Sequence, residues 1–256
     1  MKKYQIIIPC IAILFASCSP TYYVPTKQNV MVFEESKDAS VAITASWFNM
    51  QMGIEGGYAF TDHLGVYSSA YRFDASQYGS YNNLIKDYLW DNELVIFDKT
   101  KTGIYTGINL GYGFAGFNVG NPYYDIHLNR ISALPSVGYD FCREFSAALS
   151  TRFSYLHYNV SMQNSEVFTA YDRDMFNQYF NTGDLMNPNH FLIEPALTLT
   201  FKTEFVKLNL QYCCILNPGN KSTFYSRDNL SASWIFDIGK MFIKPYEKNG
   251  KLRWKF

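Results

Sequence analysis

Apolar side chains alternate with small or polar ones along most of the chain. Between residues 104 and 115 the even positions are Ile, Thr, Ile, Leu, Tyr and Phe, and the odd positions are Tyr, Gly, Asn, Gly, Gly and Ala. The same period of two recurs over residues 145–156, 190–202 and 206–212. Because successive side chains of a strand point to opposite faces, this pattern predicts β-strands with one apolar face.

The alternation and the turn residues together predict ten strands. An even number places the tight connections near residues 62, 100, 142 and 203 at one rim of an antiparallel barrel and the long segments 77–87, 161–189 and 217–226 at the other, where only the first connection, at Asn49, is very tight. A count of eight, without the weak strand at 88–97, stays an alternative, but it puts short connections on both rims. The predicted strands span residues 40–48, 51–61, 64–76, 88–97, 103–118, 125–140, 144–160, 190–203, 205–216 and 227–239.

Alternation does not say which face points outward. A small soluble barrel is apolar inside, whereas a membrane barrel has an apolar lipid face and a polar lumen. The apolar faces here are rich in aromatic residues toward the strand ends, and strands of about 10 to 15 residues are long enough to cross a bilayer when tilted. The predicted fold is therefore an all-β, antiparallel up-and-down transmembrane β-barrel. A soluble, lipid-tethered barrel that binds a small apolar ligand is the alternative.

The start of the chain has the layout of an export signal. Two lysines precede an apolar run that ends at Phe15, and two small residues then lead to Cys18. The run is shorter than the roughly 20 residues that a membrane-spanning helix needs. It resembles the lipobox of bacterial lipoproteins, with Phe15 where Leu is usual, so acylation of Cys18 with fatty acids such as palmitate is expected. An ordinary cleaved signal with an incidental cysteine is the alternative.

Charge and composition narrow the classes of function. The chain has 22 basic and 22 acidic residues, so it offers no basic footprint for nucleic acid. Apolar residues make up 48% and aromatic residues 18%, which suits strands that hide their hydrophobicity by alternation. The predicted organisation is a lipoprotein signal peptide at 1–17, a lipidated tether at 18–38, an outer-membrane barrel at 39–243 and a basic tail at 244–256.

Ionisable residues on the non-apolar faces predict a polar lumen. In a barrel of ten strands such side chains fill much of the interior, and buried charges persist only when they are paired. The predicted network contains Glu55, Arg130, Arg152 and Glu194, and it favours a salt-bridged plug over an ion or solute path. The same parity turns further residues inward, namely Arg72, Asp74, Lys202, Lys207 and Asp237.

One group of residues suggests chemistry at the outer rim. Asp172, Asp174, Asp184 and His190 lie in or beside the longest loop, and a barrel-rim hydrolase that activates water is the second alternative. No catalytic residue, metal site or cofactor is assigned, because the spacing of His and Cys matches no zinc site. Aromatic residues in the predicted outer loops suggest recognition of a glycan or a protein, without catalysis. Closure of the barrel mouth and contact with lipopolysaccharide is the alternative, and the sequence favours it.

The chain resembles the poorly characterised family of lipid-anchored outer-membrane β-barrel proteins of Gram-negative bacteria. The resemblance rests on "FASC", on "YYVPTKQNVMVFEE" and on strands such as "GINLGYGFAGF" and "ALPSVGYDF". It implies an outer-membrane location and contact with lipid, lipopolysaccharide and the barrel-assembly and lipoprotein-processing machineries. It implies no catalytic site. Because "SPTYYVPTK" has no acidic residue and the barrel starts and ends at the short-turn side, the anchor at Cys18 is expected in the periplasmic leaflet.

Overall fold

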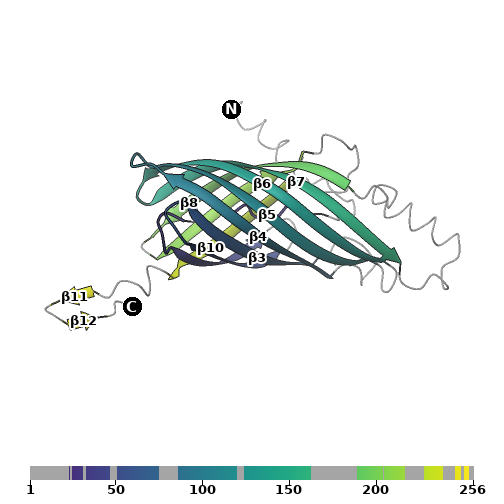
Figure 1. Ribbon diagram of the computed structural model, residues 1–256, viewed down its shortest axis with the longest axis horizontal. Coiled ribbons are helices and arrows are strands. Elements are labelled where there is room, and N and C mark those ends of the chain that lie inside the picture. Colours follow the sequence, from purple (N-terminus) through teal and green to yellow (C-terminus); the bar gives the residue numbers. More distant parts are fainter. Residues whose placement is uncertain are drawn as a thin grey trace, which may run out of the picture.

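A closed barrel of ten antiparallel strands forms the body of the protein (Figure 1). This confirms the predicted count and excludes the eight-stranded alternative. The computed structural model describes residues 23, 25–30, 33–46, 51–74, 86–119, 124–162, 189–203, 205–216, 228–238, 246–248 and 251–253. The barrel strands are β1 Ala39–Ser46, β2 Met52–Ala59, β3 Leu64–Asp74, β4 Lys86–Lys99, β5 Ile104–Val119, β6 Tyr124–Cys142, β7 Phe145–Met162, β8 Asn189–Lys202, β9 Val206–Cys214 and β10 Asp228–Asp237.

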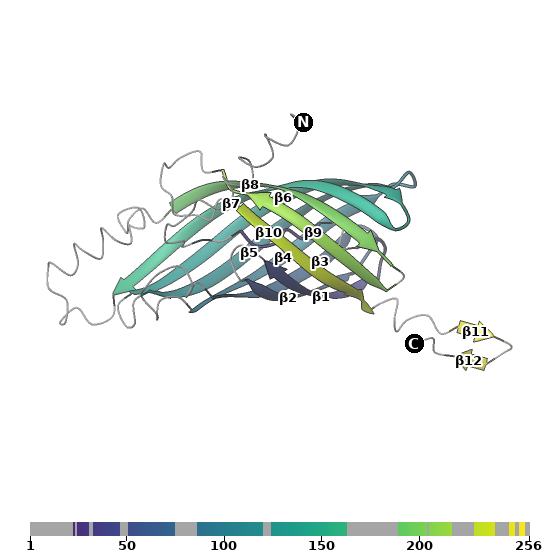
Figure 2. The same cartoon turned by 180° about the vertical axis from the view of Figure 1, so that it is seen from behind.

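Each strand pairs with its neighbours in the sequence, and the first strand pairs with the last. The ladder between β1 and β10 runs from Ser40 opposite Asp237 to Ser46 opposite Ser231. Figure 2 shows this side of the barrel, with β1 between β2 and β10. Closure leaves no strand edge unpaired, which is the condition for placing a β-structure in a bilayer.

The two rims of the barrel differ in the length of their connections. The links β2–β3, β4–β5, β6–β7 and β8–β9 are short and lie at one end, which we call the short-turn rim. The other end, which we call the long-loop rim, carries the three longest links, β3–β4, β7–β8 and β9–β10, together with the shorter links β1–β2 and β5–β6. β6 and β7 have 19 and 18 residues, whereas β1 and β2 have 8 each. The wall is therefore taller on one side of the barrel (Figure 1).

Apolar side chains of the strands point away from the lumen. On β5, Ile104, Ile108 and Phe114 are 40%, 39% and 40% exposed, whereas Asn109 between them is buried. The same outward apolar face continues on the neighbouring strands with Ile131 and Leu149. A soluble barrel that binds an apolar ligand needs its apolar face inside, so the structure does not meet the condition of that alternative.

The inward face of β3 differs from the predicted one. Tyr67 and Tyr71 are buried in the lumen, whereas Arg72 is exposed. The parity prediction for Arg72 was therefore wrong. The ring of Tyr71 lies opposite Gly53 of β2, where a glycine leaves room for it, and this packing sets the face of the strand.

A short antiparallel pair lies in the C-terminal region that the sequence predicts to be a basic tail. It consists of β11 Tyr246–Lys248 and β12 Lys251–Arg253. The sequence pattern does not predict this pair. Within the part of the chain that the structure describes, no helix is long and apolar enough to cross a bilayer.

Candidate functional site in the barrel lumen

Residues that precede β1 lie inside the barrel. Lys27 donates a hydrogen bond through Nζ to Glu55 Oε2 of β2 at 2.6 Å, and Arg152 of β7 donates to the main-chain oxygen of Lys27 at 3.0 Å. β2 and β7 stand five strands apart in either direction around the ring of ten. A residue that contacts both walls therefore lies between them. We call the described residues 23, 25–30, 33 and 34 the lumen segment; the sequence predicts only a tether here.

The wall contacts the main chain of the lumen segment at successive residues. Five side-chain nitrogen atoms, from four residues of the wall, donate hydrogen bonds to main-chain oxygens of the segment. Gln211 also accepts a hydrogen bond through Oε1 from the Gln28 amide at 2.6 Å. The segment is thus held in one extended path across the lumen. The five bonds run from Asn229 to the oxygen of Pro25, from Arg152 to those of Thr26 and Lys27, from Gln211 to that of Gln28 and from Asn109 to that of Asn29.

The carboxylate of Glu55 is fully enclosed by donors. Besides Lys27, it accepts hydrogen bonds from Tyr67 at 2.9 Å, from Tyr71 at 2.8 Å and from the Thr44 hydroxyl. The side chains of both Lys27 and Glu55 are almost completely shielded from solvent. Each partner satisfies a charge that would be costly to bury alone.

Two glycines of β2 explain how both tyrosines reach Glu55. Gly53 lies opposite Tyr71, and Gly57 lies opposite Tyr67. A Cβ at either glycine would come within 3.0 Å of the facing ring. Each ring therefore lies over a glycine, on either side of Glu55, and this leads its hydroxyl to the carboxylate. In the sequence Gly-Ile-Glu-Gly-Gly, the two glycines and the glutamate between them, Gly53, Glu55 and Gly57, lie two residues apart and so share the inward face of β2.

Substitution of Gly53 by valine is expected to lower the free energy of unfolding by about 1–3 kcal/mol, the range for overpacking a filled site. The added side chain displaces the ring of Tyr71 and breaks its hydrogen bond to Glu55. Urea titration of the barrel refolded in phospholipid vesicles measures the change. Gly56→Val is the matched control, because a Cβ at Gly56 meets no atom closer than 3.7 Å. Equal losses for the two variants would contradict the close packing.

A second network joins two arginines through the lumen segment. Arg130 pairs with Asp91 of β4 and donates to the hydroxyl of Tyr23, which itself donates to Glu194 Oε1 at 2.9 Å. Arg152 Nη1 lies 3.4 Å from Glu194 Oε2. Of the four residues predicted for the lumen network, three therefore belong to one chain of contacts. Glu55 lies apart and pairs with Lys27.

Sequence reasoning missed the contribution of β4. Asp91 and Glu93 are buried, whereas Trp90 and Leu94 are exposed, and Asn109 donates to Glu93 Oε2 at 2.8 Å. The alternation of these acids with outward apolar residues was the available signal. The signal is weak because Asn92 lies at an outward position between Trp90 and Leu94.

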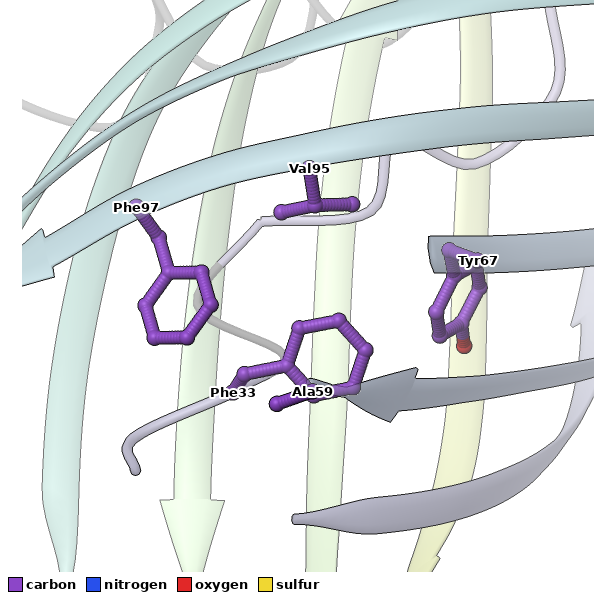
Figure 3. Packing of buried hydrophobic residues seen from close by; sticks show 5 residues of the cluster. All are labelled: Phe33, Ala59, Tyr67, Val95 and Phe97. Atoms are coloured by element: carbon purple, nitrogen blue, oxygen red, sulfur yellow. The ribbon is translucent and has the colours of Figure 1, made fainter. Parts of the chain in front are cut away.

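An apolar cluster lies in the lumen near the short-turn rim. Phe33 of the lumen segment packs with Ala59, Tyr67, Val95 and Phe97 (Figure 3). Its ring centroid lies 5.7 Å from that of Phe97 and 6.3 Å from that of Tyr67. The segment thus contributes the central ring of this cluster.

Charged residues surround the end of the lumen segment at the same rim. Glu34 lies 3.2 Å from Lys99, 3.4 Å from Lys202 and 3.5 Å from Lys207. Asp140 shares two of these lysines, at 3.2 Å from Lys99 and 2.7 Å from Lys202. A carboxylate of the segment is therefore held among three ammonium groups of the wall.

A tight turn leads from the lumen segment into β1. Asp38 Oδ2 accepts hydrogen bonds from the amides of Glu34 at 2.7 Å and Glu35 at 3.1 Å. The Ser36 amide donates to Asp62 Oδ1 at 2.9 Å, and this bond lowers the pKa of the exposed Asp62 carboxyl. From this turn the segment runs back through the lumen toward Tyr23. β1 starts at the short-turn rim, as expected, but the lumen segment that precedes it runs inside the barrel. The start of β1 therefore no longer indicates on which side of the membrane the Cys18 anchor lies.

Most of the group predicted at the outer rim cannot be placed. Asp172, Asp174 and Asp184, like Cys18, lie outside the described residues. His190 is buried in β8, with its ring centroid 5.4 Å from that of Tyr158 in an edge-to-face contact. Within the described ranges, no group of three or more His, Cys, Asp or Glu residues is arranged to hold a metal ion.

Known proteins provide only distant neighbours. No protein-family model matches the sequence, and no curated protein matches it either. The N-terminal β-barrel domain of Pseudomonas aeruginosa OprF is similar at 8% identity and a TM-score of 0.32, over 79% of this chain and 98% of that domain. A KdgM porin in complex with disordered oligogalacturonate has 8% identity and a TM-score of 0.35, over 78% and 98%. The outer membrane protease OmpT from Escherichia coli has 8% identity and a TM-score of 0.37, over 78% and 91%.

Proposed function

We propose that the protein is an integral β-barrel of the Gram-negative outer membrane whose lumen is closed by its own N-terminal segment, with a structural or surface-recognition role and no catalysis. One observation carries this proposal. The barrel is apolar on the outside and charged on the inside, the polarity that lipid requires and that water opposes. A soluble protein would expose a continuous apolar surface over much of its circumference, which monomeric soluble proteins rarely do.

The filled lumen argues against a transport role. Charged side chains from opposite walls meet across it through the lumen segment, and the apolar cluster around Phe33 adds a seal near one rim. A barrel of ten strands is narrow once long side chains project inward. Ions or solutes therefore have no open path along this part of the barrel.

Recognition is assigned to the long-loop rim. Polar and aromatic side chains gather there on outward faces: Tyr155 donates to Asn189 at 2.8 Å, and Tyr212 donates to Asp228 at 2.7 Å. Rigid strands that carry polar and aromatic groups into variable loops are the usual platform for binding. Lipopolysaccharide is the expected neighbour of this rim, and a glycan or a protein is the proposed ligand class.

Acylation of Cys18 completes the proposal. The lipobox-like sequence supports processing by the lipoprotein machinery, and the closed barrel supports folding by the barrel-assembly machinery. The barrel is then held in the membrane twice, through its acyl chains and through its outer surface. Two or more acyl chains already give stable membrane binding, so the two attachments have to be tested separately.

A Cys18→Ser variant tests the two attachments separately. We expect it to lose labelling by radioactive palmitate and yet to remain in the membrane pellet after carbonate extraction, because the apolar outer surface stays in lipid. It also keeps heat-modifiable migration on gels, which reports a folded barrel. Wild-type protein is the control. Release of the folded variant into the soluble fraction would overturn the membrane-spanning assignment and leave a tethered soluble barrel.

A further inference from the structure

The wall of the barrel is complete without the lumen segment. The ten strands close their ladder with one another. Among the described residues between Pro25 and Glu34, no main-chain hydrogen bond joins the segment to a strand. Over these residues the segment is therefore held to the wall through side chains, as a bound ligand is, and only Tyr23 at its start lies in an isolated β-bridge. Departure of the segment would leave every pair of barrel strands intact.

The wall is built to hold a main chain in an extended path. Side chains of Arg152, Gln211, Asn109 and Asn229 bond to main-chain groups of five successive residues. Such bonds do not depend on the side chains of the segment. They suit any extended polypeptide that follows the same path, as main-chain bonds do in other peptide-binding proteins.

Charge selects among the polypeptides that could follow this path. Lys27 lies in the carboxylate pocket of Glu55, and Glu34, seven residues later, lies among three lysines of the short-turn rim. The charged wall residues around the middle of the lumen carry an excess of two negative charges without the segment: Glu55, Asp91, Glu93 and Glu194 against Arg130 and Arg152.

We propose that the lumen is a binding site for an extended polypeptide that carries a lysine and, seven residues later, a carboxylate, and that the lumen segment is its resident ligand. The lysine binds in the pocket formed by Glu55, Tyr67, Tyr71 and Thr44. The carboxylate binds at the short-turn rim. The polypeptide binds in one chain direction only, since the opposite direction would place its lysine among the three lysines of the short-turn rim.

The test uses the full mature chain in detergent micelles and a fluorescein-labelled peptide with the sequence of residues 23–34. In Lys27→Glu protein, the resident segment is repelled by Glu55 and vacates the pocket. We expect this protein to bind the peptide at least about 30-fold more tightly than wild-type protein does, the lower end of the effect of leaving a buried charge unpaired. Fluorescence anisotropy measures the affinity.

A charge swap is the matched control. In Lys27→Glu/Glu55→Lys protein the two charges attract again, so the resident segment returns and the wild-type peptide is excluded. Glu55→Lys protein, in contrast, repels its own Lys27 and binds a peptide in which the lysine is replaced by glutamate. Each vacated barrel thus prefers the peptide of opposite charge by the same factor of about 30 or more.

Binding of both peptides to both barrels with equal affinity overturns the proposal, and so does absence of binding to folded Lys27→Glu protein. If Lys27→Glu protein does not fold, Lys27→Ala replaces it in the same assay, because alanine removes the ammonium group without adding a carboxylate beside Glu55. The assay does not depend on lipid. A negative result here therefore leaves the membrane assignment intact, and release of Cys18→Ser protein from membranes leaves this site intact.

Discussion

Replacement of Arg152 by methionine is expected to lower the free energy of unfolding by about 3–5 kcal/mol, the range for removing one partner of a buried ion pair. Arg152 is completely buried and contacts Glu194 at 3.4 Å. It also donates to the main-chain oxygens of Thr26 and Lys27. Its loss leaves the Glu194 carboxylate buried without this cation and releases two points of the lumen segment. Urea titration of the barrel in phospholipid vesicles measures the change.

The double variant Arg152→Met/Glu194→Met separates the charge from the packing. The double variant buries neither of the two charges, so no buried charge is left without its partner. Its free energy of unfolding is therefore expected to fall by less than the sum of the losses in the two single variants. Lys101→Met, in the exposed β4–β5 turn, is the control and should change stability by less than about 0.5 kcal/mol. Additive losses would mean that Arg152 and Glu194 do not depend on one another.

The barrel could be predicted from the sequence because its wall is encoded locally. On β5, glycines and Asn109 alternate with Ile108, Leu110 and Tyr112, and each such strand shows its two faces without reference to any other. Turn residues then locate the connections between strands, and the requirement for an even number of strands favours ten. Prediction failed at Arg72, because a cross-strand contact between Tyr71 and Gly53 sets the inward face of β3, and a single strand does not reveal such a contact.

The lumen segment could not be predicted because it has no periodic signal. Its described residues belong to no strand, with only Tyr23 in an isolated β-bridge. The segment is held by single side chains from walls that are distant in the sequence, such as Gln211, which lies 183 residues from Gln28. The inward position of Glu55, Arg130, Arg152 and Glu194 follows from alternation. Their partners do not, since Lys27 and Tyr23 come from outside the barrel strands.

Substitution of Leu110 by arginine is expected to lower the free energy of unfolding from vesicles by about 2–4 kcal/mol, the cost of a cation near the middle of the lipid face of a barrel. Leu110 is 47% exposed on the outer face of β5. It lies six residues from Ile104 at the short-turn end of the strand, which is about 20 Å of strand. With the usual tilt this corresponds to about 15 Å along the barrel axis, near the middle of an apolar band about 25 Å tall.

Ile104→Arg is the matched control on the same face of the same strand. Ile104 is similarly exposed, at 40%, but it lies at the edge of the band, where an arginine reaches the headgroups and the expected loss is about 0–1 kcal/mol. The difference between the two variants depends on depth in lipid and on nothing else in the strand. In water both positions are solvated and both arginines are harmless, so equal and small effects at the two positions would place the barrel outside the bilayer.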